Sequence, residues 1–160
     1  MNGDRLPGGV DDDTGADYVL GGRYRLISPV GTGGMAVVWE AYDDVLARSV
    51  AVKVLAAQYA NDPQSRDRVR HEAQAAAALS HPNIAQVHDY GETRINGEVI
   101  PYVVMELIRG KTLQQRLKDG PVLPGYAMRV GAEIAADLAA SHAEGVVHRD
   151  IKPANVMLAP

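Results

Sequence analysis

The chain has 160 residues, a length typical of one domain, of which 46% are hydrophobic and 22% charged, as in ordinary globular proteins. The formal net charge of −4 argues against nucleic acid as a main partner, because proteins that bind nucleic acids usually carry a basic excess. No cysteine is present, which excludes disulfides and thiolate metal sites.

Residues 1–20 are rich in glycine and aspartate and predict a disordered tail, because such a composition buries little apolar surface. The first residues lack the apolar core of a signal peptide. No run approaches the roughly 18 apolar residues that span a bilayer. We therefore expect a cytoplasmic chain with no membrane segment, while an intact longer protein could be membrane-anchored through a C-terminal region absent from this chain.

Strands and helices follow the tail in separate groups. Alternating apolar and β-branched residues predict five strands, over residues 23–30, 37–42, 50–55, 84–90 and 99–107. The last two strands flank a polar turn that contains Asn96-Gly97. Asp62-Pro63 is a helix-start signal, and it predicts a helix over residues 63–79. Two further helices are predicted over residues 112–118 and 125–144, and Gly145 lies where the C-terminus of a helix favours a left-handed residue. This order indicates an α+β fold rather than alternating βαβ units.

The glycine-rich turn Gly31-Thr32-Gly33-Gly34-Met35-Ala36 fits both a dinucleotide fingerprint and a kinase phosphate loop. A dinucleotide fold needs a helix directly after the glycines and an acidic residue about 20 positions later. Here residues 37–42 predict a strand, and residues 50–59 contain no Asp or Glu. On its own, the turn is also consistent with an ordinary hairpin that binds no ligand.

Lys53 lies in the apolar strand Val-Ala-Val-Lys and shares a face with Ala51 and Leu55, because strand side chains alternate. Such a lysine is usually an edge-strand gatekeeper or a snorkelling charge. Facing a cleft, it would bind nucleotide phosphates as a point charge. Glu72, in the next predicted helix, is a candidate site residue only as an ion-pair partner that holds Lys53.

The most specific pattern is His148-Arg149-Asp150-Ile151-Lys152-Pro153-Ala154-Asn155. Phosphoryl transfer needs a carboxylate to accept a hydroxyl proton, a lysine on the transferring phosphate and an amide oxygen for magnesium. Asp150, Lys152 and Asn155 supply these three groups. A polar loop with a structural histidine is the bland alternative, and the glycine turn, Lys53 and Glu72 in the expected order disfavour it.

Gly110-Lys111-Thr112 looks like the end of a Walker A loop. That pattern needs its first glycine at position 105, which is Met105 in this chain. No P-loop is predicted.

Together these motifs resemble the eukaryotic-like serine/threonine kinases of bacteria, from about residue 20 to the C-terminus. The resemblance implies a protein-kinase-like α+β fold. Residues 21–107 would form an N-lobe with an antiparallel β-sheet and one αC helix. Residues 108–160 would form the hinge exit, the first helices of an incomplete α-helical C-lobe and the catalytic loop.

The resemblance also implies ATP and Mg²⁺ as cofactors. The implied ATP-binding residues are Val30, Gly31, Thr32, Gly33, Gly34, Met35, Ala36, Val38, Ala51, Lys53, Met105, Glu106 and Ile108. Val38 and Ala51 would sandwich the adenine, with Met105 as the gatekeeper. The backbone of Glu106 and Ile108 would hydrogen-bond the adenine.

The catalytic residues implied by the resemblance are Asp150, Lys152, Lys53 and Glu72. Asp150 would be the base, Lys152 would neutralise the γ-phosphate, and Lys53, held by Glu72, would contact the α- and β-phosphates. Asn155 would bind one Mg²⁺. Lys152, two residues after Asp150, is the serine/threonine pattern rather than the tyrosine pattern.

The implied activity is transfer of the γ-phosphoryl group of Mg-ATP to Ser or Thr hydroxyls of protein substrates, and a kinase homodimer is a candidate assembly. Arg149 suggests an activation segment that is phosphorylated.

Ala36 replaces the third glycine, and no Asp-Phe-Gly follows the catalytic loop before Pro160. We therefore expect little activity from this chain alone. The alternative is a non-catalytic, pseudokinase-like regulatory fragment.

Overall fold

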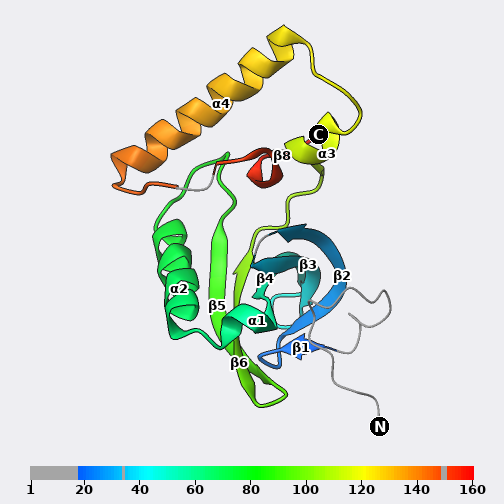
Figure 1. Ribbon diagram of the computed structural model, residues 1–160, viewed down its shortest axis with the longest axis vertical. Coiled ribbons are helices and arrows are strands. Elements are labelled where there is room, and N and C mark those ends of the chain that lie inside the picture. Colours follow the sequence, from blue (N-terminus) through cyan, green and yellow to red (C-terminus); the bar gives the residue numbers. More distant parts are fainter. Residues whose placement is uncertain (1–17, 34, 149–150) are drawn as a thin grey trace. The chain divides into compact units, whose positions relative to one another are not determined.

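The computed structural model describes residues 18–33, 35–148 and 151–160 (Figure 1). The chain divides into two compact units by its internal contacts. The first unit consists of the described residues up to Ala77 together with Val87–Leu107. The second unit consists of Ala78–Gln86 and Ile108–Pro160.

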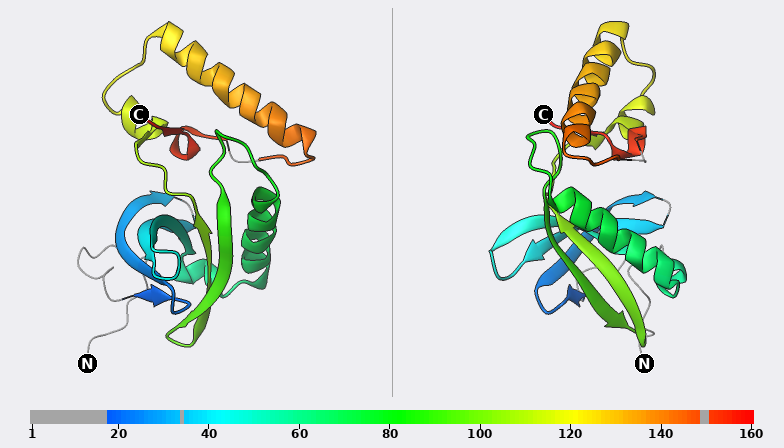
Figure 2. Two further views of the ribbon diagram at one scale, coloured as in Figure 1. Left: turned by 180° about the vertical axis from the view of Figure 1, so that it is seen from behind. Right: turned by 90° about the vertical axis from the view of Figure 1, so that its left-hand side faces the viewer.

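The first unit is built on a six-stranded antiparallel sheet. In spatial order its strands are β1 (Val19–Leu20), β2 (Tyr24–Gly33), β3 (Ala36–Asp43), β4 (Arg48–Leu55), β6 (Glu98–Met105) and β5 (Val87–Ile95). A short helix α1 (Ala57–Ala60) and the longer α2 (Pro63–Ala77) follow β4. Helix α2 packs beside β5 and β6 (Figures 1 and 2).

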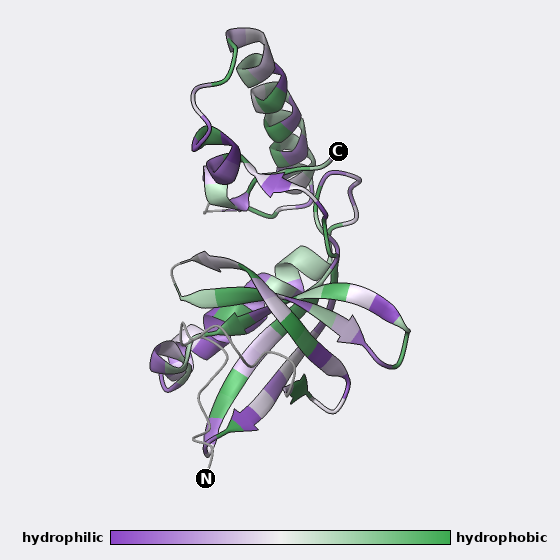
Figure 3. Cartoon of the chain, turned by 90° about the vertical axis from the view of Figure 1, so that its right-hand side faces the viewer, coloured by the Kyte–Doolittle hydropathy of each residue, from purple (hydrophilic) through white to green (hydrophobic). Residues whose placement is uncertain are grey.

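One face of the sheet forms the hydrophobic core. The residues of β3 and β4 that face it are all 8% exposed or less: Val37, Trp39, Ala41, Val50, Val52 and Val54. The alternation behind this arrangement appears as hydrophobic and hydrophilic bands along the strands in Figure 3. Burial of one face of this kind fixes which side of each strand points inward.

The β5–β6 hairpin turns at Asn96 and Gly97, as the sequence predicted. Their φ angles of 53° and 81° are both in the left-handed region. Two such residues give a turn whose twist matches that of the flanking strands.

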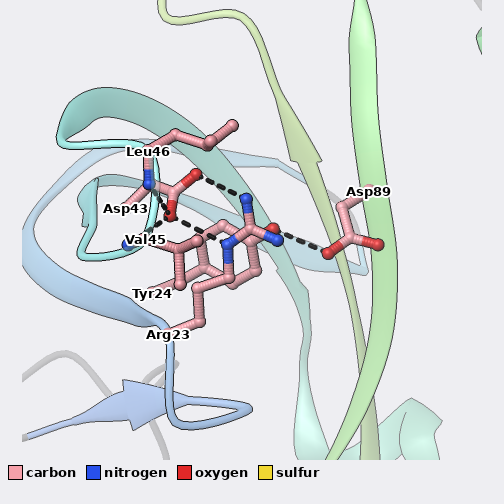
Figure 4. A network of polar contacts seen from close by, with 6 residues as sticks. All are labelled: Arg23, Tyr24, Asp43, Val45, Leu46 and Asp89. Carbon is pink, nitrogen blue, oxygen red and sulfur yellow. Dashed lines mark hydrogen bonds and ion pairs between the residues drawn. The ribbon is translucent and has the colours of Figure 1, made fainter.

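A buried carboxylate closes the β3–β4 turn (Figure 4). Asp43 is only 1% exposed. Its oxygens accept hydrogen bonds from Nε and Nη2 of Arg23 at 2.8 and 2.9 Å, and from the backbone N–H groups of Val45 and Leu46 at 2.9 and 3.1 Å. The Arg23 hydrogen bonds, supported by the two backbone donors, hold the pKa of Asp43 far below its usual range.

A second polar contact joins two strands that are not neighbours in the sheet. The hydroxyl of Tyr24 in β2 donates to Oδ2 of Asp89 in β5 at 2.6 Å (Figure 4). Burial, followed by this hydrogen bond, raises the pKa of Tyr24. The start of β2 is thus fixed both to the β3–β4 turn and to β5.

The second unit contains α3 (Leu113–Leu117), α4 (Pro124–Ala143), a 3₁₀ turn η2 (Pro153–Asn155), and a small sheet of β7 (Lys111–Thr112) and β8 (Met157–Leu158). In α4, the residues spaced four apart, Val130, Ile134 and Leu138, are half-buried. Gly145, with a φ of 77°, follows this helix as predicted. Within the described ranges, no helix has the length and apolar character needed to span a bilayer.

The loop over residues 78–86 belongs to the second unit because it is fastened to α4. Nδ2 of Asn83 donates to Oδ1 of Asp137 at 3.1 Å, and Nδ1 of His81 lies 3.4 Å from the same oxygen. The loop leaves the first unit after α2 and returns to it at β5.

Several boundaries differ from the sequence predictions. Val19 and Leu20 form β1, so the expectation of a disordered tail is wrong for these two residues, and residues 1–17 lie outside the described ranges. The strand expected over residues 84–90 is β5, which runs from Val87 to Ile95 because it pairs with β6 along its whole length. The elements α1, β7 and β8 were not predicted.

Removing the Asp43 carboxylate should destabilise the protein far more than removing its exposed neighbour. We expect Asp43→Ala to lower the free energy of unfolding by about 3 kcal/mol, because breaking a buried ion pair leaves its partners unsatisfied. Asp44→Ala removes only an exposed pair with Arg25, and it should cost less than about 1 kcal/mol. Urea titration followed by the fluorescence of Trp39, the single tryptophan, measures both losses. Equal losses would contradict the structural role of Asp43.

The low pKa of Asp43 also predicts a loss of stability in acid. The folded pKa lies below the unfolded value of about 3.9, so the folded state binds fewer protons. The stabilisation is therefore complete above the unfolded pKa and disappears as the pH falls towards the folded pKa. We expect the urea midpoint to fall between about pH 5 and pH 2, and to fall less for Asp43→Asn. Parallel pH curves for the two proteins would exclude this assignment.

Candidate functional site

The sheet face opposite the core carries the residues predicted to contact adenine and phosphate. The pairing of β3 with β4 places Val38 opposite Lys53, and the pairing of β4 with β6 places Ala51 opposite Met105. Directly paired residues project to the same face, as do residues two apart in one strand. Val38, Ala51, Lys53 and Met105 therefore share one face, although they come from three strands.

These four side chains differ in exposure. Ala51 is 6% exposed, Val38 and Met105 are half-buried, and Lys53 is exposed. These four side chains thus combine apolar surface with an accessible ammonium group, an arrangement suited to a ligand with an apolar ring and an anionic group.

The predicted phosphate loop is the tip of the β2–β3 hairpin. Gly31 pairs with Val38 and Gly33 pairs with Ala36, so the glycines lie directly beside the strand that carries Val38. Thr32 is exposed, and Gly34 lies outside the described residues.

The residues that flank the glycines have contrasting surroundings. Val30 lies at a register irregularity in β2 and is 44% exposed. Met35 packs against the hydrophobic core, and its carbonyl accepts a hydrogen bond from the N–H of Ala56 at 2.7 Å. Ala36, where the third glycine of the pattern is replaced, is buried.

Helix α2 begins at an acidic cap, as the sequence predicted. Asp62 accepts hydrogen bonds from the N–H of Gln64 at 3.1 Å and from the hydroxyl of Ser65 at 2.8 Å. The hydrogen bond from Ser65 is the main cause that lowers the pKa of Asp62. This cap fixes the start of the helix that carries Glu72.

Lys53 and Glu72 both lie in the first unit, and both are exposed. Across the described part of the chain, no ion pair joins the two side chains. The pairing expected from the sequence is therefore not formed in this structure.

The chain passes from the first unit to the second through the predicted adenine-binding backbone. Glu106 follows directly after β6 and is exposed, and Ile108, which opens the second unit, is half-buried. The two residues thus lie on either side of the boundary between the units.

Part of the predicted catalytic loop is described in the second unit. Arg149 and Asp150 lie outside the described residues. The side chains of Lys152 and Asn155 are both exposed, and the N–H of Asn155 donates to the carbonyl of Lys152 at 2.9 Å. The turn η2 therefore fixes the spacing between the predicted phosphate-binding lysine and the predicted metal-binding amide.

The described residues fit Mg²⁺ only in part. The side-chain oxygen of Asn155 is a hard ligand of the kind that Mg²⁺ prefers. The described ranges contain no cluster of three or more His, Cys, Asp or Glu side chains able to hold a metal ion. In proteins, Mg²⁺ commonly binds through one or two side chains and takes its remaining ligands from substrate phosphates and water.

Comparison with known proteins identifies relatives over most of the chain. A model of the protein kinase domain family matches residues 24–160. Serine/threonine-protein kinase PknA of Mycobacterium tuberculosis is 47% identical over 143 residues, which cover 88% of this chain and 33% of PknA. The probable serine/threonine-protein kinase SCO3848 of Streptomyces coelicolor is 51% identical over 140 residues, which cover 87% of this chain and 21% of that protein.

Solved structures show the same fold. The crystal structure of the PknI kinase domain of Mycobacterium tuberculosis matches with a TM-score of 0.74 and 31% identity, over 92% of this chain and 59% of that one. The α+β fold expected from the sequence is therefore confirmed as the protein-kinase fold. The matched region is only part of each relative's length.

Proposed function

This chain is a member of the protein kinase family, and on that premise we propose that it forms the ATP-binding and catalytic-loop part of a serine/threonine protein kinase. The reaction is in-line transfer of the γ-phosphoryl group of Mg-ATP to a Ser or Thr hydroxyl of a protein substrate. The observation that supports this best is the strand register that places Val38, Ala51, Lys53 and Met105 on one face.

The first unit would bind the nucleotide. Val38 and Ala51 would contact the adenine ring, Val30 would add apolar surface, and Met105 would limit the space beside the ring. The backbone of Glu106 and Ile108 would hydrogen-bond the adenine edge. Backbone groups of residues 31–36 would approach the phosphates closely, which a loop containing several glycines permits.

Lys53 would neutralise charge on the α- and β-phosphates as a point charge. Glu72 would orient that ammonium, and kinase activity in this family requires the pair to be in place. Because the two side chains are unpaired here, pairing would require a rearrangement of the side chains or of α2.

The second unit would supply the groups that act on the transferred phosphoryl. Asp150 would accept the proton of the attacking hydroxyl, and Lys152 would stabilise charge on the phosphoryl oxygens. Asn155 would supply an amide oxygen to Mg²⁺, which when bound neutralises charge on the phosphates. Positioning and charge stabilisation of this kind account for most of the rate enhancement.

The rival proposal is a non-catalytic module that binds nucleotide or another kinase. Degraded motifs would favour it, whereas Lys53, Glu72, Asp150 and Asn155 are all present. We therefore infer that the chain derives from an active kinase. We expect only weak phosphoryl transfer by these 160 residues alone, because the Asp of Asp-Phe-Gly, a magnesium ligand in this family, is not among them.

Binding and transfer should depend on different residues. We expect Lys53→Met to weaken Mg-ATP binding by about tenfold, the size of one charge-assisted hydrogen bond, without weakening adenosine binding. Asp150→Asn should leave Mg-ATP affinity unchanged, as should the control Lys118→Met, which removes an exposed lysine at the C-cap of α3. Isothermal titration calorimetry measures these affinities. If Lys53→Met and Lys118→Met had the same effect, the phosphate contact of Lys53 would be wrong.

Phosphoryl transfer itself is tested with γ-labelled ATP and a generic protein substrate. We expect little or no label transfer by the 160-residue chain, and transfer by a longer chain that supplies an Asp-Phe-Gly segment. Asp150→Asn in that longer chain should abolish transfer, because the substrate hydroxyl then lacks its proton acceptor. Robust turnover by the 160-residue chain would refute its expected inactivity, and turnover that survives Asp150→Asn would refute the role of the carboxylate.

A further inference from the structure

Gly110, which directly precedes β7 in the second unit, excludes any side chain for two reasons. Its φ is 147°, a backbone conformation that residues with a side chain rarely adopt. A Cβ atom at this position would also lie less than 3.0 Å from the carbonyl oxygen of Leu158 and 3.1 Å from its carbonyl carbon. Real Cβ atoms essentially never lie within 3.0 Å of another heavy atom of this kind, so Leu158 would have to move.

The close approach of Leu158 belongs to a short ladder of backbone contacts. In this ladder Lys111 pairs with Leu158 and Thr112 pairs with Met157. The N–H of Leu113 donates to the carbonyl of Val156 at 2.8 Å. Three consecutive residues after Asn155 are therefore held along three consecutive residues after Gly110.

The strand that carries the ladder is itself fixed to a helix. The hydroxyl of Thr112 accepts a hydrogen bond from the N–H of Gln115 at 3.0 Å, and the side chain of Gln115 accepts one from the N–H of Thr112 at 2.8 Å. This reciprocal capping box fixes the start of α3. The Gly-Lys-Thr sequence thus has a structural role, although it is not a phosphate loop.

We propose that Gly110 is a positioning residue for Asn155. By admitting the carbonyl of Leu158 against the backbone, Gly110 allows the β7–β8 ladder to form, and the ladder holds the C-terminal side of the turn η2 that carries Asn155. A side chain at position 110 would displace Leu158, weaken the ladder and loosen the amide that contacts the Mg²⁺ of Mg-ATP. The contact between the Asn155 amide and Mg²⁺ rests on the proposed function.

The chain offers a matched control for the glycine. Gly120 also has a positive φ, 117°, but nothing lies within 4 Å of a Cβ added there. Gly110→Ala and Gly120→Ala therefore both place a side chain on a residue with positive φ in the same unit, and only the first displaces Leu158. Both variants are made in the full 160-residue chain.

A milder second variant keeps the proposal testable if Gly110→Ala fails to fold. Leu113 is the first residue of α3, where proline is tolerated, and Thr112 before it is already extended, with φ −69° and ψ 154°. Leu113→Pro removes the N–H that donates to Val156 and also replaces the half-buried leucine side chain, so Leu113→Ala, which keeps the N–H, is its control. We expect it to shift metal binding in the same direction as Gly110→Ala.

The first measurement is hydrogen exchange at the backbone amide of Leu113, which reports the ladder without any ligand. We expect exchange to be about tenfold faster in Gly110→Ala and within about twofold of wild type in Gly120→Ala. Unchanged exchange in Gly110→Ala, or equal acceleration in both variants, would overturn the proposal.

The second measurement uses Mn²⁺ with ATP and follows paramagnetic broadening of the Asn155 side-chain amide by NMR. Gly110→Ala and Leu113→Pro should each raise the Mn²⁺ concentration for half-maximal broadening by about fivefold, while ATP affinity without a divalent ion stays constant. A faster-exchanging ladder with an unchanged Mn²⁺ midpoint would refute the positioning role alone. Absence of broadening at Asn155 in the wild type would refute the metal assignment, and with it the positioning role.

Discussion

The antiparallel register of β3, β4 and β6 is the constraint on which the rest of the first unit depends. It places Val38, Ala51, Lys53 and Met105 on one face and Trp39, Val52 and other apolar residues on the opposite, buried face. A slip of one residue would turn Lys53 into the core, where an unpaired ammonium is very costly. Hydrophobic burial therefore fixes the register, and the register in turn places the candidate site.

The polar network of Asp43 and Tyr24 complements this register from one end of β2. Tyr24, at the start of the strand, lies opposite Asp43, whereas Gly33, at the other end, lies opposite Ala36. The first end is fixed by a buried ion pair and a hydrogen bond to β5. Strong anchoring at the start of β2 thus accompanies a tip built from glycines, where close backbone approach to a phosphate would be needed.

The sequence predicted much of this arrangement because its longer elements carry strong periodic patterns. The strands around Lys53 and the helix that begins after Asp62 were expected close to where they lie. The turn at Asn96-Gly97 was also expected, since its residues favour positive φ. These features depend on neighbours within a few positions along the chain.

The remaining features depend on partners far along the chain. Asp43 and Asp44 look equivalent in the sequence. In the fold, Arg23 and two backbone N–H groups surround the buried carboxylate of Asp43, whereas Asp44 only pairs with the exposed Arg25. The two-residue strands β7 and β8 are too short for a periodic signal. They form because the residues that follow the predicted catalytic loop pair with the residues that follow Gly110. The expected Lys53–Glu72 pair depends on side-chain and helix placement, which residue spacing does not determine.

Binding of ATP to the non-core face of the sheet can be followed directly by NMR titration. Backbone amide and methyl spectra would be recorded as Mg²⁺ and a non-hydrolysable ATP analogue are added to the 160-residue chain. We expect the largest shift changes at Val38, Ala51, Lys53 and Met105, with Val45 in the β3–β4 turn unaffected. No change at millimolar nucleotide, or changes confined to residues away from this face, would contradict this expectation.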